Sequence, residues 1–301
     1  MTALQLFLQQ LANGLTLGAI YALIALGYTM IYGIIQLINF AHGEVFIVGA
    51  YAVLSVALLA GAALPWWVAL LACGLGAIAI CTALGTVIER AAYRPVRASP
   101  RLNALIIAIG TSFVLQNALM LLYGATDRQV PRLIPFIRWN LGGITVTLAH
   151  VVIWTASAAV MAGLQLLVMT TRIGKAMRAT ADDRTACALL GIPVDRVIAA
   201  TFMIGSALAA VGGMLFGLHY GTINFHDGYL VGLKAFTAAV LGGIGNIPGA
   251  MVGGLVLGLL EGLGAGYLSA QWKNVFAFVL LVVLLLFKPT GLFGERVGER
   301  A

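Results

Sequence analysis

The sequence predicts an all-α integral membrane protein, a polytopic bundle of about eight or nine transmembrane helices with an inverted internal repeat and interrupted helices. Of its 301 residues, 61% are hydrophobic and 9% are charged, and the mean hydropathy is +1.03. The apolar runs reach about 20 residues, the length of a membrane-spanning helix. Soluble domains carry about a quarter charged residues, and outer-membrane barrel strands are alternating segments of about ten residues. The composition therefore excludes both classes.

The chain is predicted to form a single transmembrane domain over residues 1–301. No Lys or Arg occurs in residues 1–11, so the positive segment of a cleavable signal is missing and the first apolar run is expected to stay as a span. The nine runs give nine spans, or eight if one enters the membrane and returns. They lie at about 12–35, 44–61, 66–88, 102–123, 147–170, 197–220, 229–245, 250–268 and 274–288.

A polar interruption separates the first two runs and recurs later in the chain. Residues 38–44 read Ile-Asn-Phe-Ala-His-Gly-Glu, and residues 223–228 read Ile-Asn-Phe-His-Asp-Gly, 185 positions later. This offset predicts repeat halves at about 12–88 and 197–268. The sixth span follows the first by an odd number of crossings, so the repeat is predicted to be inverted. Inverted repeats are a common transporter architecture, with the substrate path between the halves.

The basic residues predict the orientation in the membrane. Two loops, 89–101 and 172–196, hold most of the twelve Lys and Arg assigned to the cytoplasm, against four on the opposite side. Cytoplasmic loops are enriched in these residues, so the N-terminus is predicted outside and the C-terminus inside. Topology signals and contacts with the lipid bilayer account for the net charge of +7. We expect no nucleic-acid partner.

Ionisable and amide side chains at the spans are the candidates for a substrate path. Glu44, Lys234 and Glu261 each cost about 2.5 kcal/mol or more at the bilayer centre. We expect a polar path, an ion pair between Lys234 and one of the two glutamates, or a side chain that extends to the membrane interface. Glu44 is expected near the inner surface, at a helix start, where a carboxylate also favours the helix dipole. The full candidate set is Asn39, His42, Glu44, Asn224, His226, Asp227 and Lys234.

Some of these residues have competing structural roles. Asn39 and Asn224 stand where helices are expected to stop, and capping of freed backbone groups is the commoner role of such amides. His42 and His226 have no third ligand at usable spacing, so no metal site is predicted.

Enzymatic and nucleotide chemistry are not expected in this chain. No nucleophile and base form a defensible catalytic set, and the three cysteines lack metal-ligand spacing. The glycine-rich residues 242–246 are not followed by the Gly-Lys-Ser/Thr of a nucleotide-binding loop. We therefore predict no catalytic residue and no cofactor in this chain.

The loop 172–196 is predicted to hold a short amphipathic helix. Over residues 174–191, Ala, Leu and Met fall on one side and Lys, Arg and Asp on another, and Gly191 ends the helix before Pro193. Such a helix suits docking in a groove of a soluble partner. The alternative is a helix that lies on the lipid surface.

Four stretches resemble one known family. Residues 37–44 (LINFAHGE), 89–97 (ERAAYRPVR), 189–192 (LLGI) and 234–245 (KAFTAAVLGGIG) are similar to LivH-type permeases of high-affinity branched-chain amino-acid ABC importers. The similarity covers essentially the whole chain. It implies inward movement of Leu, Ile or Val by alternating access in the bacterial inner membrane. It also implies a homologous second permease, two cytoplasmic ATPase subunits that bind the ATP, and a periplasmic amino-acid-binding protein.

By the same resemblance, the loop 172–196 is the coupling loop that contacts the ATPases. ABC permeases carry a Glu-Ala-Ala then Gly signature there, with Asp in this chain where the family has small residues. The assigned residues are Arg178, Ala181, Asp182, Asp183 and Gly191. Permeases for urea and short-chain amides share the asparagine at position 39 and the Ala-His-Gly motif at residues 41–43. A urea or amide permease, or a passive channel for a small polar solute, is therefore the alternative.

Overall fold

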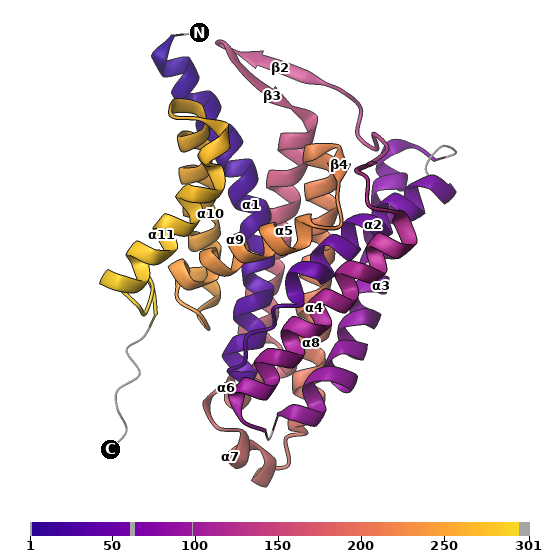
Figure 1. Ribbon diagram of the computed structural model, residues 1–301, viewed down its shortest axis with the longest axis vertical. Helices are drawn as coiled ribbons and strands as arrows, with labels where there is room; N and C mark the ends of the chain where they lie inside the picture. The colour runs from indigo at the N-terminus through magenta and orange to yellow at the C-terminus, as the bar shows by residue number, and fades with distance from the viewer. Residues whose placement is uncertain (1, 61–63, 98, 295–301) are drawn as a thin grey trace.

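The computed structural model describes residues 2–60, 64–97 and 99–294, which form a bundle of helices (Figure 1). Eight helical segments of this described part are long and apolar enough to cross a membrane. The predicted all-α polytopic fold is confirmed; residue 61, the end of the second predicted run, lies outside the described residues. The segments are α1 (Ala3–Ile35), α2 (His42–Ala60), α3 (Trp66–Ile88), α4 (Arg101–Tyr123), α5 (Leu148–Thr170), α8 (Val194–Tyr220), α10 (Ile247–Tyr267), and α11 (Lys273–Phe287) with the 3-10 turn Ala270–Trp272 before it.

The run 229–245 forms a shorter helix, α9 (Asp227–Gly242), of 16 residues. At 1.5 Å per residue it is about 24 Å long, which is less than the roughly 30 Å of a bilayer core. It ends where Gly243 adopts a φ of 101°. The helix of this seventh run is therefore shorter than a span, and it is the one run that is not among the eight candidate spans of the described residues.

Two interruptions occupy corresponding places in the chain. α1 ends at Ile35 and α8 at Tyr220, while α2 begins at His42 and α9 at Asp227, so both pairs of boundaries are 185 residues apart. A left-handed residue ends each long helix: Gln36 with a φ of 52° after α1, and Gly221 with a φ of 72° after α8.

The two long central helices pack antiparallel. Gly205 of α8 lies beside Ile31 of α1, whereas Gly212 lies beside Ile24, so the residue numbers rise in one helix as they fall in the other. This is the relation expected of an inverted repeat.

Glycines in equivalent positions bring α2 and α9 together. Gly43 and Gly228, again 185 residues apart, lie against each other: a Cβ atom added to Gly228 would lie 2.9 Å from the Gly43 carbonyl oxygen. A Cβ atom on Gly43 would lie 2.9 Å from the Gly232 Cα atom. Small residues permit such close approach of helix backbones in membranes. Equivalent residues of a two-fold repeat touch only near its axis, so this contact is the one that the predicted repeat requires.

The bundle has two distinct ends (Figure 1). One end carries two short antiparallel pairs, β1 (Arg128–Gln129) with β4 (Thr222–Ile223) and β2 (Arg138–Leu141) with β3 (Ile144–Thr147). The other end carries α6 (Arg172–Asp182), α7 (Arg184–Leu189), and a π-helical turn (Glu89–Tyr93) followed by a 3-10 turn (Arg94–Val96). Following the orientation predicted from charge, we call these the outer end and the inner end.

The core lies along α1, α2 and α8. Within their most apolar stretches, 89% of α1, 72% of α2 and 67% of α8 is buried in the protein, against 17% of α4 and 11% of the segment that contains α11. α4, α5 and α11 expose apolar side chains at the periphery. Such side chains suit contact with lipid or with another membrane subunit.

Candidate functional site

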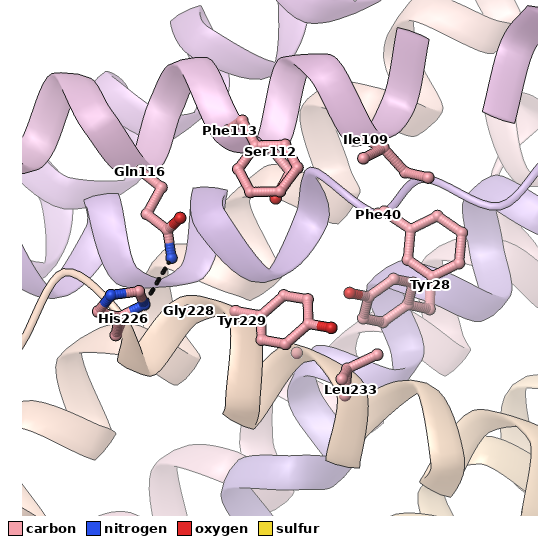
Figure 2. Close-up of a pocket in the computed structure, with 11 residues that line it drawn as sticks. Tyr28, Phe40, Ile109, Ser112, Phe113, Gln116, His226, Gly228, Tyr229 and Leu233 are labelled. Atoms are coloured by element: carbon pink, nitrogen blue, oxygen red, sulfur yellow. Dashed lines mark hydrogen bonds between the residues drawn. The ribbon is translucent and has the colours of Figure 1, made fainter. Parts of the chain in front are cut away.

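A cavity of about 340 Å³ lies between α4 and α9, beside the crossing of α2 and α9 (Figure 2). Aromatic and aliphatic side chains form most of its wall, with a few polar groups among them. A cavity of this kind is typical of a small-molecule site. We call it the central cavity. Its lining residues are Tyr28, Phe40, Ile109, Ser112, Phe113, Gln116, His226, Gly228, Tyr229, Gly232 and Leu233.

His226, a predicted path residue, lines the central cavity. Its Nδ1 atom lies 2.9 Å from Gln116 Nε2, as the dashed line in Figure 2 shows. Its backbone N–H donates to the Asn224 side-chain oxygen at 3.0 Å. The ring is therefore fixed by α4 on one side and by the turn before α9 on the other.

Glu44 lies behind the cavity wall. It is 1% exposed, and its Oε1 atom accepts a hydrogen bond of 3.2 Å from Ser112, which lines the cavity. Its Oε2 atom has no hydrogen-bond partner among the described residues. A Cβ atom on Gly228 would lie 2.5 Å from that oxygen. The carboxylate is thus one residue away from the cavity, behind the wall formed by Ser112 and Gly228.

The depth expected for Glu44 is wrong. Ser112 is the central residue of α4, so Glu44 lies level with the middle of that span and not near the inner surface. The reason is the path of the chain after α1. The ring of His42 lies against Gly27, about two turns before the end of α1. The segment 36–41 therefore runs back along α1 before α2 begins, which no local sequence signal indicates.

His42 and Asn39 do not line the cavity. His42 is fully buried and packs edge-on against Tyr28, with ring centroids 4.8 Å apart. Neither ring nitrogen has a hydrogen-bond partner in the described part of the chain. The Asn39 side-chain oxygen accepts a hydrogen bond of 2.9 Å from the Tyr93 hydroxyl. Asn39 therefore ties the first interruption to the turn after α3. Asn224 accepts its bond from His226 within the turn before α9, while the start of α9 itself has no side-chain cap.

Asn224, Asp227 and Lys234 line a second cavity of about 310 Å³, which we call the outer cavity. On α9, residues 227, 230, 231 and 234 face the outer cavity and residues 228, 229, 232 and 233 face the central one. Residues three and four apart share a helix face. α9 thus divides the predicted path residues between two cavities.

Lys234 is held by a buried ion pair. Its Nζ atom lies 2.9 Å from Glu261 Oε1, and the Tyr21 hydroxyl donates to Glu261 Oε2 at 2.9 Å. Lys234 is 7% exposed and Glu261 2% exposed. The ion-pair interpretation of these two residues is therefore correct, and the partner is Glu261 rather than Glu44. Intramembrane charges are commonly compensated in this way.

The inner segment (residues 172–191) contains two helices where one was expected. Asp183 breaks the predicted helix between α6 and α7 with a φ of −151°. Its side chain accepts hydrogen bonds from the backbone N–H groups of Thr185 (2.7 Å) and Ala186 (3.0 Å). Asp is a preferred N-cap, so a second helix begins there. Gly191 ends the segment with a φ of 80°, as expected.

α7 lies at the extreme inner end of the bundle (Figure 1), and two leucines stand at its C-terminal end. Leu189 is 85% exposed and Leu190 81% exposed. The assigned coupling residues behave differently: Arg178 contacts Met169 of α5, and Ala181, Asp182 and Asp183 line a polar cavity of about 420 Å³. We call this the inner cavity. The sequence signal for the leucines is an apolar pair directly before a terminating glycine.

An ion-pair network joins the segment after α3 to the start of α8. Arg97 pairs with Glu89 and, at 2.9 Å, with Asp195, and Arg94 pairs with Asp195 as well. Burial lowers the pKa of the Arg97 guanidinium, while the Asp195 carboxylate acts in the opposite direction. Burial also lowers the pKa of Arg184, which lies nearby.

Sequence reasoning missed most of the central cavity. Tyr28, Phe40, Phe113 and Tyr229 are aromatic residues in apolar runs, which by themselves indicate packing. A polar pair within the fourth run, Ser112 and Gln116, is the one available signal, since residues four apart share a helix face. Among the described residues, no group of three or more His, Cys, Asp and Glu side chains is placed to hold a metal ion.

Comparison with known proteins gives one consistent result. Residues 10–285 match a family model described as "Branched-chain amino acid transport system / permease component". The high-affinity branched-chain amino acid transport system permease protein LivH of Salmonella typhimurium is 50% identical, over 98% of this chain and 97% of that one. The corresponding BraD protein of Pseudomonas aeruginosa is 49% identical over 98% of both chains. A probable LivH of Methanocaldococcus jannaschii is 28% identical, over 90% of this chain and 88% of that one.

Proposed function

The chain belongs to the family of branched-chain amino acid transport permeases, and we propose that it is the permease subunit of an ATP-driven importer for branched-chain amino acids. The observation that carries this proposal is the 50% identity to LivH along 98% of the chain. The eight membrane-spanning segments are the scaffold that such a permease requires.

We propose four partner subunits of three kinds, located in and beside a bacterial inner membrane. A second, homologous permease completes the membrane path, two ATPases bind at the inner end, and a periplasmic amino-acid-binding protein docks at the outer end. The name of the relative supports an assembly, because LivH is a permease protein of a transport system. Residues 242–246 lack a nucleotide-binding sequence, so ATP is assigned to the ATPases.

We propose that the substrate path follows the central cavity. Its aromatic and aliphatic wall suits a branched aliphatic side chain. The free carboxylate oxygen of Glu44, one residue behind the wall, suits the ammonium group of a zwitterion. Both features lie at the crossing of the two interrupted helices, where transporters with inverted repeats place their substrates. His226 is the predicted path residue in the wall itself.

We propose that the inner segment docks on the ATPases through Leu189 and Leu190. Exposed apolar side chains on the water-facing end of a membrane protein indicate a protein contact. Gly191 and Asp183 fix the shape of this tip, the first through its left-handed backbone and the second as the cap of α7.

The test is uptake of radiolabelled leucine, with urea in parallel, in proteoliposomes that contain the permease pair, the ATPases and the binding protein. Leucine accumulation that requires internal ATP is the expected result. ATP-independent equilibration of urea would contradict the proposal and identify a channel. Omission of the binding protein is the matched control and should remove leucine uptake.

A further inference from the structure

Arg184 connects the inner segment to the inner end of α1. Its Nε and Nη2 atoms donate to the carbonyl oxygen of Ile34 at 3.0 Å and 2.6 Å. Ile34 is the penultimate residue of α1, so this carbonyl is one of those left without a partner inside the helix. A guanidinium at a helix C-terminus also interacts favourably with the helix dipole. The contact is therefore both a charge-assisted bond and a cap.

Within the described residues, these two bonds of Arg184 are the only side-chain hydrogen bonds that join α6 and α7 to a helix beyond α5. Apolar packing also holds α6, since Met177 is buried against the inner part of α1. Next to the bond, however, the inner cavity separates Gln36 and Leu37 from residues 180–183. With room on that side, the inner segment can shift without pushing the chain that follows α1, unless Arg184 holds the two together.

The chain directly after this contact leads to the central cavity. Gln36 ends α1, and four residues further Phe40 stands in the cavity wall, followed by Glu44 behind it. Tyr28, on α1 itself, is another wall residue. A displacement of the end of α1 therefore moves the wall of the central cavity in two ways, through Tyr28 on α1 itself and through Phe40 on the chain that follows.

We propose that Arg184 is the positioning residue that transmits movement of the inner segment to the end of α1 and so to the wall of the central cavity. This inference rests on the proposed function, in which the inner segment moves with the ATPases. A link between distant sites needs an element that both sites bias. The end of α1 is that element, because Arg184 fixes one side of it and Phe40 and Glu44 continue from the other.

The experiment compares variants of the full complex in proteoliposomes with internal ATP, and measures leucine uptake and phosphate release together. The readout is the amount of leucine taken up per ATP hydrolysed. Arg184→Met should lower this ratio about tenfold while hydrolysis and assembly persist, because hydrogen bonds from charged groups are worth about one factor of ten. Arg184→Lys should lower it less, since Lys supplies a point charge without the guanidinium fork.

Arg90→Met is the matched control. Arg90 is an exposed arginine at the same end of the bundle, and it makes no hydrogen bond or ion pair with the described residues. The Arg90→Met variant should therefore take up as much leucine per ATP hydrolysed as the wild type. A wild-type ratio in Arg184→Met would overturn the inference. If that variant fails to assemble, a wild-type ratio in Arg184→Lys would overturn it equally. A wild-type complex without ATP-dependent uptake would instead refute the proposed function, whatever the variants do.

Discussion

Gly228→Ala tests whether the crossing of the two interrupted helices is as close as the structure places it. The new Cβ atom would lie 2.5 Å from Glu44 Oε2, 2.7 Å from Ile47 Cγ2 and 2.9 Å from the Gly43 carbonyl oxygen. All three distances are shorter than van der Waals contact. The two side chains have some freedom to rotate, but the Gly43 oxygen belongs to the backbone of α2 and moves only with that helix.

The size of the effect follows from this geometry. Insertion of one methyl group into a packed interior typically costs about 1–3 kcal/mol. Because a backbone atom is among the contacts, we expect a cost near the upper value, about 3 kcal/mol. We expect a lower melting temperature of the purified complex. We also expect weaker leucine uptake at temperatures where the variant remains folded, since Gly228 lines the central cavity.

Gly110→Ala provides the matched control. Gly110 lies in α4, and a Cβ atom added there would meet nothing within 4 Å. The same substitution in a helix with open space should leave both the melting temperature and uptake unchanged or slightly higher, because Ala favours helix more than Gly by about 1 kcal/mol. If Gly228→Ala behaves like Gly110→Ala in both assays, the reasoning about the crossing is refuted.

Three further predictions concern the ion pair, the tip of the inner segment and the cavity wall. Lys234→Met should destabilise the protein by about 3–5 kcal/mol because it leaves Glu261 buried and unpaired, and Lys234→Met combined with Glu261→Leu should recover most of the loss; thermal unfolding of both variants decides this, and equal melting temperatures would contradict it. Leu189→Ser with Leu190→Ser should weaken ATPase binding about tenfold or more, the effect of losing a central apolar contact, with unchanged membrane insertion; undiminished co-purification of the ATPases would count against docking at this tip. His226→Ala should reduce leucine uptake about fivefold, since one hydrogen bond is worth about 1 kcal/mol, without loss of assembly; normal uptake would remove this side chain from the path.

The structure also changes which substitutions test the coupling assignment. Charge reversal at Asp183 removes the cap of α7, because this side chain accepts two backbone hydrogen bonds. A loss of coupling in such a variant would therefore reflect the shape of the tip as well as any contact with the ATPases. Leu189 and Leu190 make no comparable internal bond and give the cleaner test.

The sequence by itself determined the fold class, the spans and the place of both interruptions. Lipid offers no hydrogen-bond partners, so a chain with long apolar runs must form helices that satisfy their own backbone. The boundary at Ile35 was visible in the sequence for the same reason, and the start at Asp227 lies two residues before the predicted one, since a polar, glycine-containing stretch cannot continue such a helix. The family was readable too, because its motifs are long and contiguous.

Only the tertiary structure decided how these parts meet. Lys234 pairs with Glu261 and not with Glu44, and Glu44 lies beside the middle of α4. The path of the chain after Gln36 and the crossing of α2 with α9 set these partners. Composition and periodicity describe one helix at a time, whereas the partner of a buried charge depends on which helix lies opposite. That choice is made by packing between residues up to 240 positions apart, as for Tyr21 and Glu261.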